Sequence, residues 1–201
     1  MKLVLATNNV HKIREITNIL AGLDVELLTA RDFPDFPEPH ESGETLAENA
    51  RIKAVEVHHA TGLPALADDS GLEVDFLDGQ PGVISSRFAG SGCTFADNNR
   101  KLLRLLEGVE DAKRTARFRC VAALALSADD VHVFEGIVEG RITTRTHGNR
   151  GFGYDPVFFL PELGKTFAEV PKDVKNQYSH RGRAFRQVAE FLRGFSRAES
   201  Q

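Results

Sequence analysis

The sequence predicts an α/β fold built on a mixed β-sheet. In the first half of the chain, strand-like apolar runs alternate with helical patterns, which is typical of parallel strands joined by helices. Two long strand patterns follow later, and Asp129-Asp130 between them is a hairpin turn signal. With 201 residues, of which 41% are hydrophobic and 27% charged, the chain is long and apolar enough to bury a core.

The first half of the chain carries the alternation of strands and helices. Short apolar runs predict strands, and apolar residues spaced three and four apart predict helices. Thr45 and Glu48 have the spacing of a capping box, which marks a helix start. The predicted elements are a strand at 3–6, a helix ending at Gly22, a strand at 25–29, a proline-rich loop at 31–43, a helix from Thr45 to near Gly62, and strands at 64–67 and 72–76.

The second half of the chain carries the predicted hairpin and the last helix. Glycines and prolines at 79–92 predict a long loop. Ser179 is a good N-cap for a final helix with an apolar stripe. The predicted elements are a helix starting near Phe95, strands at 116–127 and 131–143, a strand at 156–160, mostly loop at 161–178, and a helix opening after Ser179.

Composition excludes several classes of function. The formal net charge of −4 gives the chain no general attraction for a polyanion, which argues against nucleic-acid binding. Cys93 and Cys120 form no CxxC motif, so we expect two reduced thiols. The N-terminal apolar run ends at Asn8, too early for a signal peptide, and no run is long enough to span a bilayer. We therefore expect a cytoplasmic protein with no membrane partner.

The turn at residues 7–12 is the first candidate for a functional site. It joins a strand to a helix N-terminus, where free backbone N–H groups and the helix dipole favour an anion. Lys12 falls in the first turn and adds a positive charge. An ordinary N-cap, in which an Asn side chain satisfies the first amides, explains the same residues equally well.

Acidic residues form the second candidate. Asp68, Asp69 and Ser70 are predicted to end a buried strand, and Glu41 lies in the loop before the second helix. Carboxylates are the hard oxygen ligands that Mg²⁺ needs, and one of them could deprotonate a water. The alternative is a turn in which Asp68 to Gly71 bond their own backbone. Paired charge beside a buried strand weakens that alternative, because such burial costs free energy.

Two further segments could bind a nucleotide. In the glycine-rich segment 151–156, Phe152 or Tyr154 could stack on a base, although aromatic residues entering the core are equally compatible with it. Lys175 and Arg181 flank the start of the last helix, where positive charge opposes the helix dipole. We therefore expect an anionic partner near that helix start.

Together these segments resemble the HAM1-like, or RdgB-like, inosine/xanthosine triphosphate pyrophosphatases over nearly the whole chain. Each motif is modest alone, but their order along the chain is specific. The motifs are Thr7-x-Asn9-x-x-Lys12, Glu41-Ser-Gly, Glu48-Asn49-Ala50, Ala67-Asp68-Asp69-Ser70-Gly71-Leu72, Pro81-Gly82, Ser86-Arg87, Gly151-Phe152-Gly153-Tyr154-Asp155-Pro156, and Lys175 followed by Ser179-His180-Arg181.

The resemblance implies one two-lobed domain over residues 1–201, with a long twisted mixed sheet, flanking helices, a central active-site cleft and a homodimeric assembly. It implies that Asp69 is the catalytic base and a Mg²⁺ ligand, with Glu41 a second ligand and Lys12 a catalytic cation. The other residues that it places against the substrate are Thr7, Asn8, Asn9, Val10, His11, Ser70, Phe152, Gly153, Tyr154, Asp155, Lys175, His180 and Arg181. Asn49 and Lys53, one helical turn apart, could also reach the cleft.

The reaction implied is hydrolysis of ITP, dITP or XTP to the monophosphate and pyrophosphate, which keeps these bases out of DNA and RNA. A water would attack the α-phosphorus while Lys12, the loop amides and Arg87 stabilise the developing charge. Arg181 and backbone N–H groups would pair with the 6-oxo group of the base, which adenine lacks. The alternatives are a Maf-like pyrophosphatase with another base preference and a nucleotide-binding regulator without turnover.

Overall fold

The computed structural model describes residues 1–39 and 41–198, which form two compact units. Unit 1 comprises Met1–Asp69, Cys120–Gly136 and Arg181–Gln201, and unit 2 comprises Ser70–Arg119 and Ile137–His180. Each unit has its own hydrophobic core. That the chain is a single domain stays a prediction.

The strands form a seven-stranded sheet in the order β2-β1-β3-β4-β5-β6-β7. The first three strands pair in parallel, and β5, β6 and β7 pair in antiparallel, so the predicted mixed sheet is confirmed. Their bounds are β1 Lys2–Leu5, β2 Glu26–Leu28, β3 Ala65–Val74, β4 Thr115–Ala125, β5 Val131–Ile142, β6 Phe158–Leu160 and β7 Lys165–Thr166.

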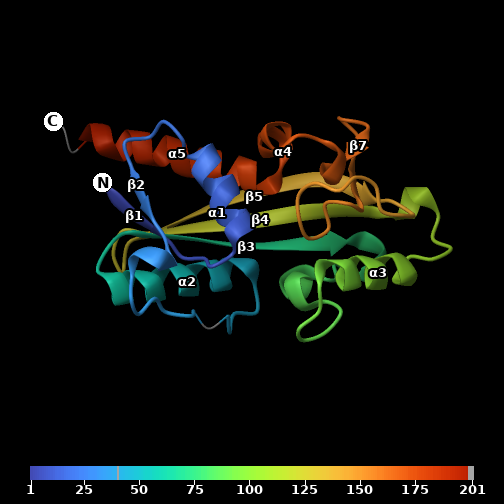
Figure 1. The fold of residues 1–201 in the computed structure, drawn as a ribbon, viewed down its shortest axis with the longest axis horizontal. Helices are drawn as coiled ribbons and strands as arrows, with labels where there is room; N and C mark the ends of the chain where they lie inside the picture. Colours follow the sequence, from blue (N-terminus) through green and yellow to red (C-terminus); the bar gives the residue numbers. More distant parts are fainter. Residues whose placement is uncertain (40, 199–201) are drawn as a thin grey trace. The chain divides into compact units, whose positions relative to one another are not determined.

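Helices cover both faces of the strands in unit 1. Helices α1 (Val10–Ile19) and α5 (His180–Ala198) lie over one face and α2 (Leu46–Thr61) over the other (Figure 1). Alternate side chains of a strand point to opposite faces. Leu3, Leu5 and Leu66 accordingly pack in one core with apolar residues of α1 and α5. The carboxyl end of β1 and the part of β3 up to Asp69 thus lie between helices, and these helices bring side chains to them.

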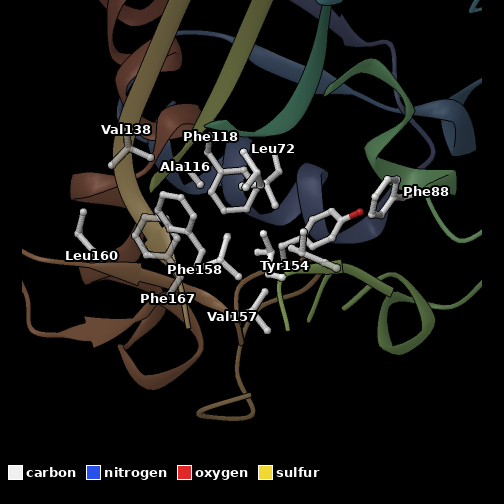
Figure 2. Packing of buried hydrophobic residues seen from close by; sticks show 14 of the residues in the cluster. Leu72, Phe88, Ala116, Phe118, Val138, Tyr154, Val157, Phe158, Leu160 and Phe167 are labelled. Atoms are coloured by element: carbon white, nitrogen blue, oxygen red, sulfur yellow. The ribbon is translucent and has the colours of Figure 1, made fainter. Parts of the chain in front are cut away.

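The core of unit 2 is rich in aromatic side chains (Figure 2). Phe118 of β4, Phe158 of β6 and Phe167 contact one another, with ring centroids 4.6 Å apart for the first pair and 5.4 Å for Phe158 and Phe167. Helix α3 (Phe95–Leu105) contributes Leu102 to this core. Helix α4 (Lys172–Tyr178) precedes α5.

Two parts of the sequence-based prediction are wrong. We predicted that a strand ends at Asp68 and that another begins at Leu72, but β3 continues through both. The acidic residues stay inside the strand because cations neutralise them, as described below. The segment 161–178, predicted as mostly loop, holds β7 and α4, and Lys175 of α4 is buried by an ion pair that the sequence pattern does not show.

Helix boundaries follow the predicted signals closely. Thr45 caps α2 and forms the expected capping box with Glu48, and Gly62 ends the helix with a φ of 68°. Helix α3 begins at Phe95 and α5 at His180. The turn around Asp130 joins β4 to β5, as predicted. In the described part of the chain, no helix combines the length and the apolar character that crossing a membrane requires.

Candidate active site

The turn between β1 and α1 is organised by an N-cap. The Asn9 Oδ1 atom accepts hydrogen bonds from the backbone N–H groups of His11 at 3.0 Å and Lys12 at 3.3 Å. The Asn9 N–H donates to the Thr7 hydroxyl at 3.2 Å. The capping explanation is therefore confirmed, and it places Lys12 in the first helical turn. That residues 7–12, which include Asn8 and the half-exposed Val10, contact substrate stays a prediction.

Asp68 lies on the face of β3 that α1 and α5 cover. Its carboxylate is fully buried, and Oδ2 contacts the Lys12 ammonium at 3.1 Å and Arg181 Nη2 at 2.9 Å. Burial alone would raise the pKa of this carboxyl, but Lys12, Arg181 and Lys53 outweigh burial and hold the pKa far below its usual range. Asp68, to which the family resemblance assigned no role of its own, therefore stays ionised and holds Lys12 against the strand.

Asp69 faces the other side of β3, toward α2. Its Oδ1 atom contacts Lys53 Nζ at 3.1 Å, and the same ammonium contacts Glu41 Oε1 at 2.9 Å. Burial raises the pKa of Asp69, and nearby Glu41 adds to this, while Lys53 and Lys12 oppose it; the net shift is upward. Burial opposes the charge on Lys53, but three carboxylates outweigh it and raise the Lys53 pKa. The ammonium of Lys53 thus links two carboxylates that sequence analysis assigned to a metal site.

Helix α2 also holds the loop that carries Glu41. Asn49, 1% exposed, accepts a hydrogen bond from the Gly43 N–H at 2.8 Å through Oδ1. Lys53 follows one helical turn later. Both residues were predicted to reach the site, and the structure brings Lys53 into direct contact with Glu41 and Asp69.

In unit 2, a tight turn at residues 152–155 forms a second group of predicted site residues. The Asp155 carboxylate accepts hydrogen bonds from the Phe152 N–H at 2.8 Å and from Lys175 Nζ at 2.6 Å. The Lys175 ammonium also lies 4.8 Å from the centre of the Phe152 ring. Asp155 and Lys175 are both buried. The ion pair therefore fixes the backbone and the aromatic ring of the turn together.

This turn requires glycine at its start. Gly151 has a φ of 73°, and a Cβ atom there would collide with the Asp155 carboxylate. The turn is held from two further sides: Asn99 Nδ2 of α3 donates to the Gly153 carbonyl at 2.9 Å, and the Tyr154 hydroxyl donates to the Ser85 carbonyl at 2.8 Å. Tyr154 is thus a core residue, which was one of the two explanations left open.

The remaining predicted residues have packing partners of their own. His180 is buried and stacks on Phe118, with ring centroids 4.6 Å apart and an angle of 13° between the planes. Ser70 is half-buried within β3. The Arg181 guanidinium, 2% exposed, faces Asp68 and Glu15. A contact of Arg181 with the base stays a prediction, since carboxylates engage both ends of its guanidinium.

Sequence reasoning missed Glu15 and Asn99. Glu15 is buried at 4% exposure in α1 and lies three residues after Lys12, hence on the same side of the helix. That spacing, beside the apolar stripe, was the available signal. Asn99 is 6% exposed, and its contact with Gly153 spans 54 residues of sequence, so no local pattern indicates it.

The described residues do not gather three or more His, Cys, Asp or Glu side chains into a metal site. Two carboxylates do converge, because Glu41 and Asp69 contact one nitrogen atom. Mg²⁺ is commonly held by one or two carboxylates together with water and substrate phosphates. The chemistry of this donor pair therefore fits Mg²⁺ bound jointly with a nucleotide.

Comparison with known proteins places the chain among nucleotide pyrophosphatases. A dITP/XTP pyrophosphatase of Geobacter sulfurreducens is 51% identical over 191 residues, which are 95% of this chain and 96% of that protein. One of Thioalkalivibrio sulfidiphilus is 50% identical over 196 residues, 96% of this chain and 100% of that protein. The structure of a HAM1 protein from Coxiella burnetii superposes with a TM-score of 0.89 at 40% identity, covering 96% of this chain and 99% of that one. Since the model of the Ham1 family also matches residues 3–191, this chain belongs to the Ham1 family.

Proposed function

We propose that this protein hydrolyses non-standard purine nucleoside triphosphates, namely dITP, ITP and XTP, to the monophosphate and pyrophosphate. The relatives that it matches over nearly their whole length carry the name dITP/XTP pyrophosphatase. The observation that supports this most directly is the pair of adjacent carboxylates on β3. One is kept ionised by cations, and the other has a raised pKa beside a second carboxylate.

The two carboxylates Glu41 and Asp69 are the proposed ligands of Mg²⁺. A bound divalent cation supplies neutralisation of phosphate charge and polarises the phosphoryl oxygens. Lys53 keeps these two carboxylates close together, since its ammonium contacts both. Asn49 contributes by holding the backbone at Gly43, two residues after Glu41.

The catalytic roles that we propose follow from charge and position. Asp69 accepts a proton from the attacking water, because its carboxylate lies beside the proposed metal ligand Glu41 and is held in place by Lys53. Lys12 stabilises the charge that develops on the phosphates, and its ammonium is accessible to them because it is partly exposed, unlike that of a core lysine. The side chains of Asp68 and Arg181 do not contact the reacting atoms in this scheme.

The turn in unit 2 is the proposed base-binding element. Phe152 offers an aromatic ring whose position is fixed by Lys175 and by the backbone bond to Asp155. A 6-oxo group accepts a hydrogen bond from backbone N–H groups, whereas the 6-amino group of adenine would face them as a second donor. We therefore expect inosine and xanthine to be preferred over adenine.

A substrate panel tests the proposal. Purified protein is incubated with Mg²⁺ and ITP, dITP, XTP, GTP or ATP, and pyrophosphate and orthophosphate are measured separately. We expect pyrophosphate as the primary product, released fastest from the inosine and xanthine nucleotides and only with a divalent cation present. Orthophosphate as the sole primary product would contradict attack at the α-phosphorus.

A matched pair of variants separates an enzyme from a nucleotide-binding regulator. Asp69→Asn removes the proposed base and should lower kcat by at least about a hundredfold while nucleotide binding persists. Asp24→Asn makes the same chemical change at an exposed position and should keep full activity. Equal activity of Asp69→Asn and the control would exclude the proposed chemistry.

We further propose that the protein works as a homodimer in the cytoplasm on the free nucleotide pool, and that residues 1–201 form one domain. The net charge of −4 fits a protein without a nucleic-acid partner. Light scattering of the purified protein tests the dimer, and a mass equal to one chain would contradict it.

A further inference from the structure

Helix α1 carries a buried carboxylate that the proposed mechanism does not use. Glu15 is 4% exposed, and its Oε2 atom contacts Arg181 Nη1 at 2.7 Å. A buried ionised carboxylate is costly unless it is paired. The contact therefore joins α1 to the start of α5.

The guanidinium of Arg181 also contacts Asp68 of β3, so it links α1 to this strand. Its Nε and Nη2 atoms donate to Asp68 Oδ2 at 3.3 Å and 2.9 Å, while Nη1 faces Glu15. Since a guanidinium is planar and rigid, carboxylates at both of its ends fix its position. Glu15 thus determines where Arg181 places its remaining hydrogen bonds.

Asp68 then holds the ammonium of Lys12. The Lys12 Nζ atom contacts Asp68 Oδ2 at 3.1 Å and donates to the Asp68 backbone carbonyl at 3.3 Å. The four side chains close a circuit, because Lys12 and Glu15 lie on the same helix. Two carboxylates balance two cations within it: Glu15 contacts Arg181, and Asp68 contacts both Arg181 and Lys12.

We infer that Glu15 is a positioning residue, which keeps the Lys12 ammonium in place for the phosphates through Arg181 and Asp68; this rests on the proposed function. Without the charge of Glu15, the Asp68 carboxylate that Arg181 and Lys12 already share is left to balance both cations of this circuit. Arg181 is buried at 2% side-chain exposure, whereas Lys12 is 16% exposed. Lys12 is therefore the cation that moves away, because it alone has solvent within reach.

Steady-state kinetics of Glu15→Gln test this inference. A cation misplaced by about 1 Å lowers a catalysed rate by roughly ten- to a hundredfold. We expect kcat for ITP hydrolysis to fall by at least about tenfold, with KM changed by less than about threefold, since Lys12 acts mainly on charge that develops in the reaction. Arg14→Gln, which removes a charge of the opposite sign at an exposed neighbouring position of α1, should leave both constants unchanged.

A double-mutant cycle with Lys12→Met separates positioning from a general structural role. If Glu15 acts through Lys12, Glu15→Gln costs less than about twofold once Lys12 is absent. A structural role would lower the rate by the same factor in both backgrounds, and that result overturns the inference. Glu15→Asp retains the charge in a shorter side chain, so it gives the same comparison if the glutamine variant does not fold.

The proposed function and the positioning role fail in different ways. Wild-type protein that releases no pyrophosphate from any nucleotide of the panel overturns both. Wild-type activity together with an unchanged kcat in folded Glu15→Gln overturns only the positioning role. A kcat loss that disappears in the Lys12→Met background supports both.

Discussion

The substitution Asp68→Asn should destabilise the protein strongly, because it removes one partner of a buried ion network. The carboxylate is fully buried and contacts two cations, Lys12 at 3.1 Å and Arg181 at 2.9 Å. At about 3 Å and an effective dielectric constant of about 20, each such pair is worth roughly 5 kcal/mol of attraction. Much of this attraction offsets the cost of burying the charges.

The net loss follows from what the substitution leaves behind. Asparagine cannot neutralise Arg181 and Lys12, because its amide oxygen accepts hydrogen bonds but carries no formal charge. Removing one partner from a buried ion pair costs about 3–5 kcal/mol. Because Glu15 still contacts Arg181, we expect the lower half of that range, a large share of a typical total stability of about 5–15 kcal/mol.

Urea unfolding followed by circular dichroism measures this loss. With a slope of about 2 kcal/mol per M, the midpoint should fall by about 1.5–2 M. Glu26→Gln is the control, since it breaks an exposed ion pair with Lys2 whose atoms are 3.9 Å apart and whose side chains are 60% and 58% exposed. Such pairs contribute about 0–1 kcal/mol. If Asp68→Asn lost no more than this control, the buried network would not stabilise the fold as we argue.

Three further predictions concern the turn in unit 2 and two helix starts. Gly151→Ala should weaken ITP binding and cost about 1–2 kcal/mol of stability, because alanine is strained at a φ of 73° and its Cβ meets the Asp155 carboxylate; calorimetry measures both. The hydroxyl and N–H of Thr94 donate to the Asp97 carboxylate and lower its pKa, so this contribution is complete above the unfolded-state pKa of about 3.9 and is lost as pH falls through the lower folded-state pKa. In thermal unfolding, Asp97→Asn should be less stable than wild type at pH 7, and the difference should shrink as the pH is lowered below about 3.9. Thr45→Ala should lower the unfolding free energy by about 1 kcal/mol, and Thr45→Gly by only a few tenths; an unchanged unfolding free energy in Thr45→Ala would show that the cap does not act through its hydroxyl.

Local signals in the sequence predicted helix boundaries well. A cap acts within a few residues, so Thr45 and Gly62 could be read as the ends of α2 before its packing was known. The predicted strand end at Asp68-Asp69 was wrong because it depends on contacts between residues that are distant in the sequence. Two adjacent acidic residues disfavour a buried strand unless cations meet them, and those cations come from residues 12, 53 and 181.

The difference between local signals and long-range contacts also applies to the candidate site. Motif resemblance selected the candidate segments, and within them the structure pairs Lys12 with Asp68, and Lys53 with both Glu41 and Asp69. The motifs could not assign a role to each of these residues, because the partner that a charged side chain contacts depends on how the helices pack. Glu15 shows this most clearly, since its partner lies 166 residues away.

The two adjacent carboxylates of β3 act as two different sites because a strand alternates its side chains. On one face Asp68 meets two cations and stays ionised, and on the other Asp69 shares one ammonium with Glu41 and has a raised pKa. On the first face, the negative charge of Asp68 holds Lys12 and Arg181. The second face has two carboxylates for one ammonium, an excess of negative charge that suits a divalent cation or a proton. A slip of β3 by one residue would turn each carboxylate to the opposite face of the sheet and break this arrangement. The register of this strand, with Val4 opposite Ala65 and Leu5 opposite Leu66, is thus a requirement of the proposed chemistry and of the fold alike.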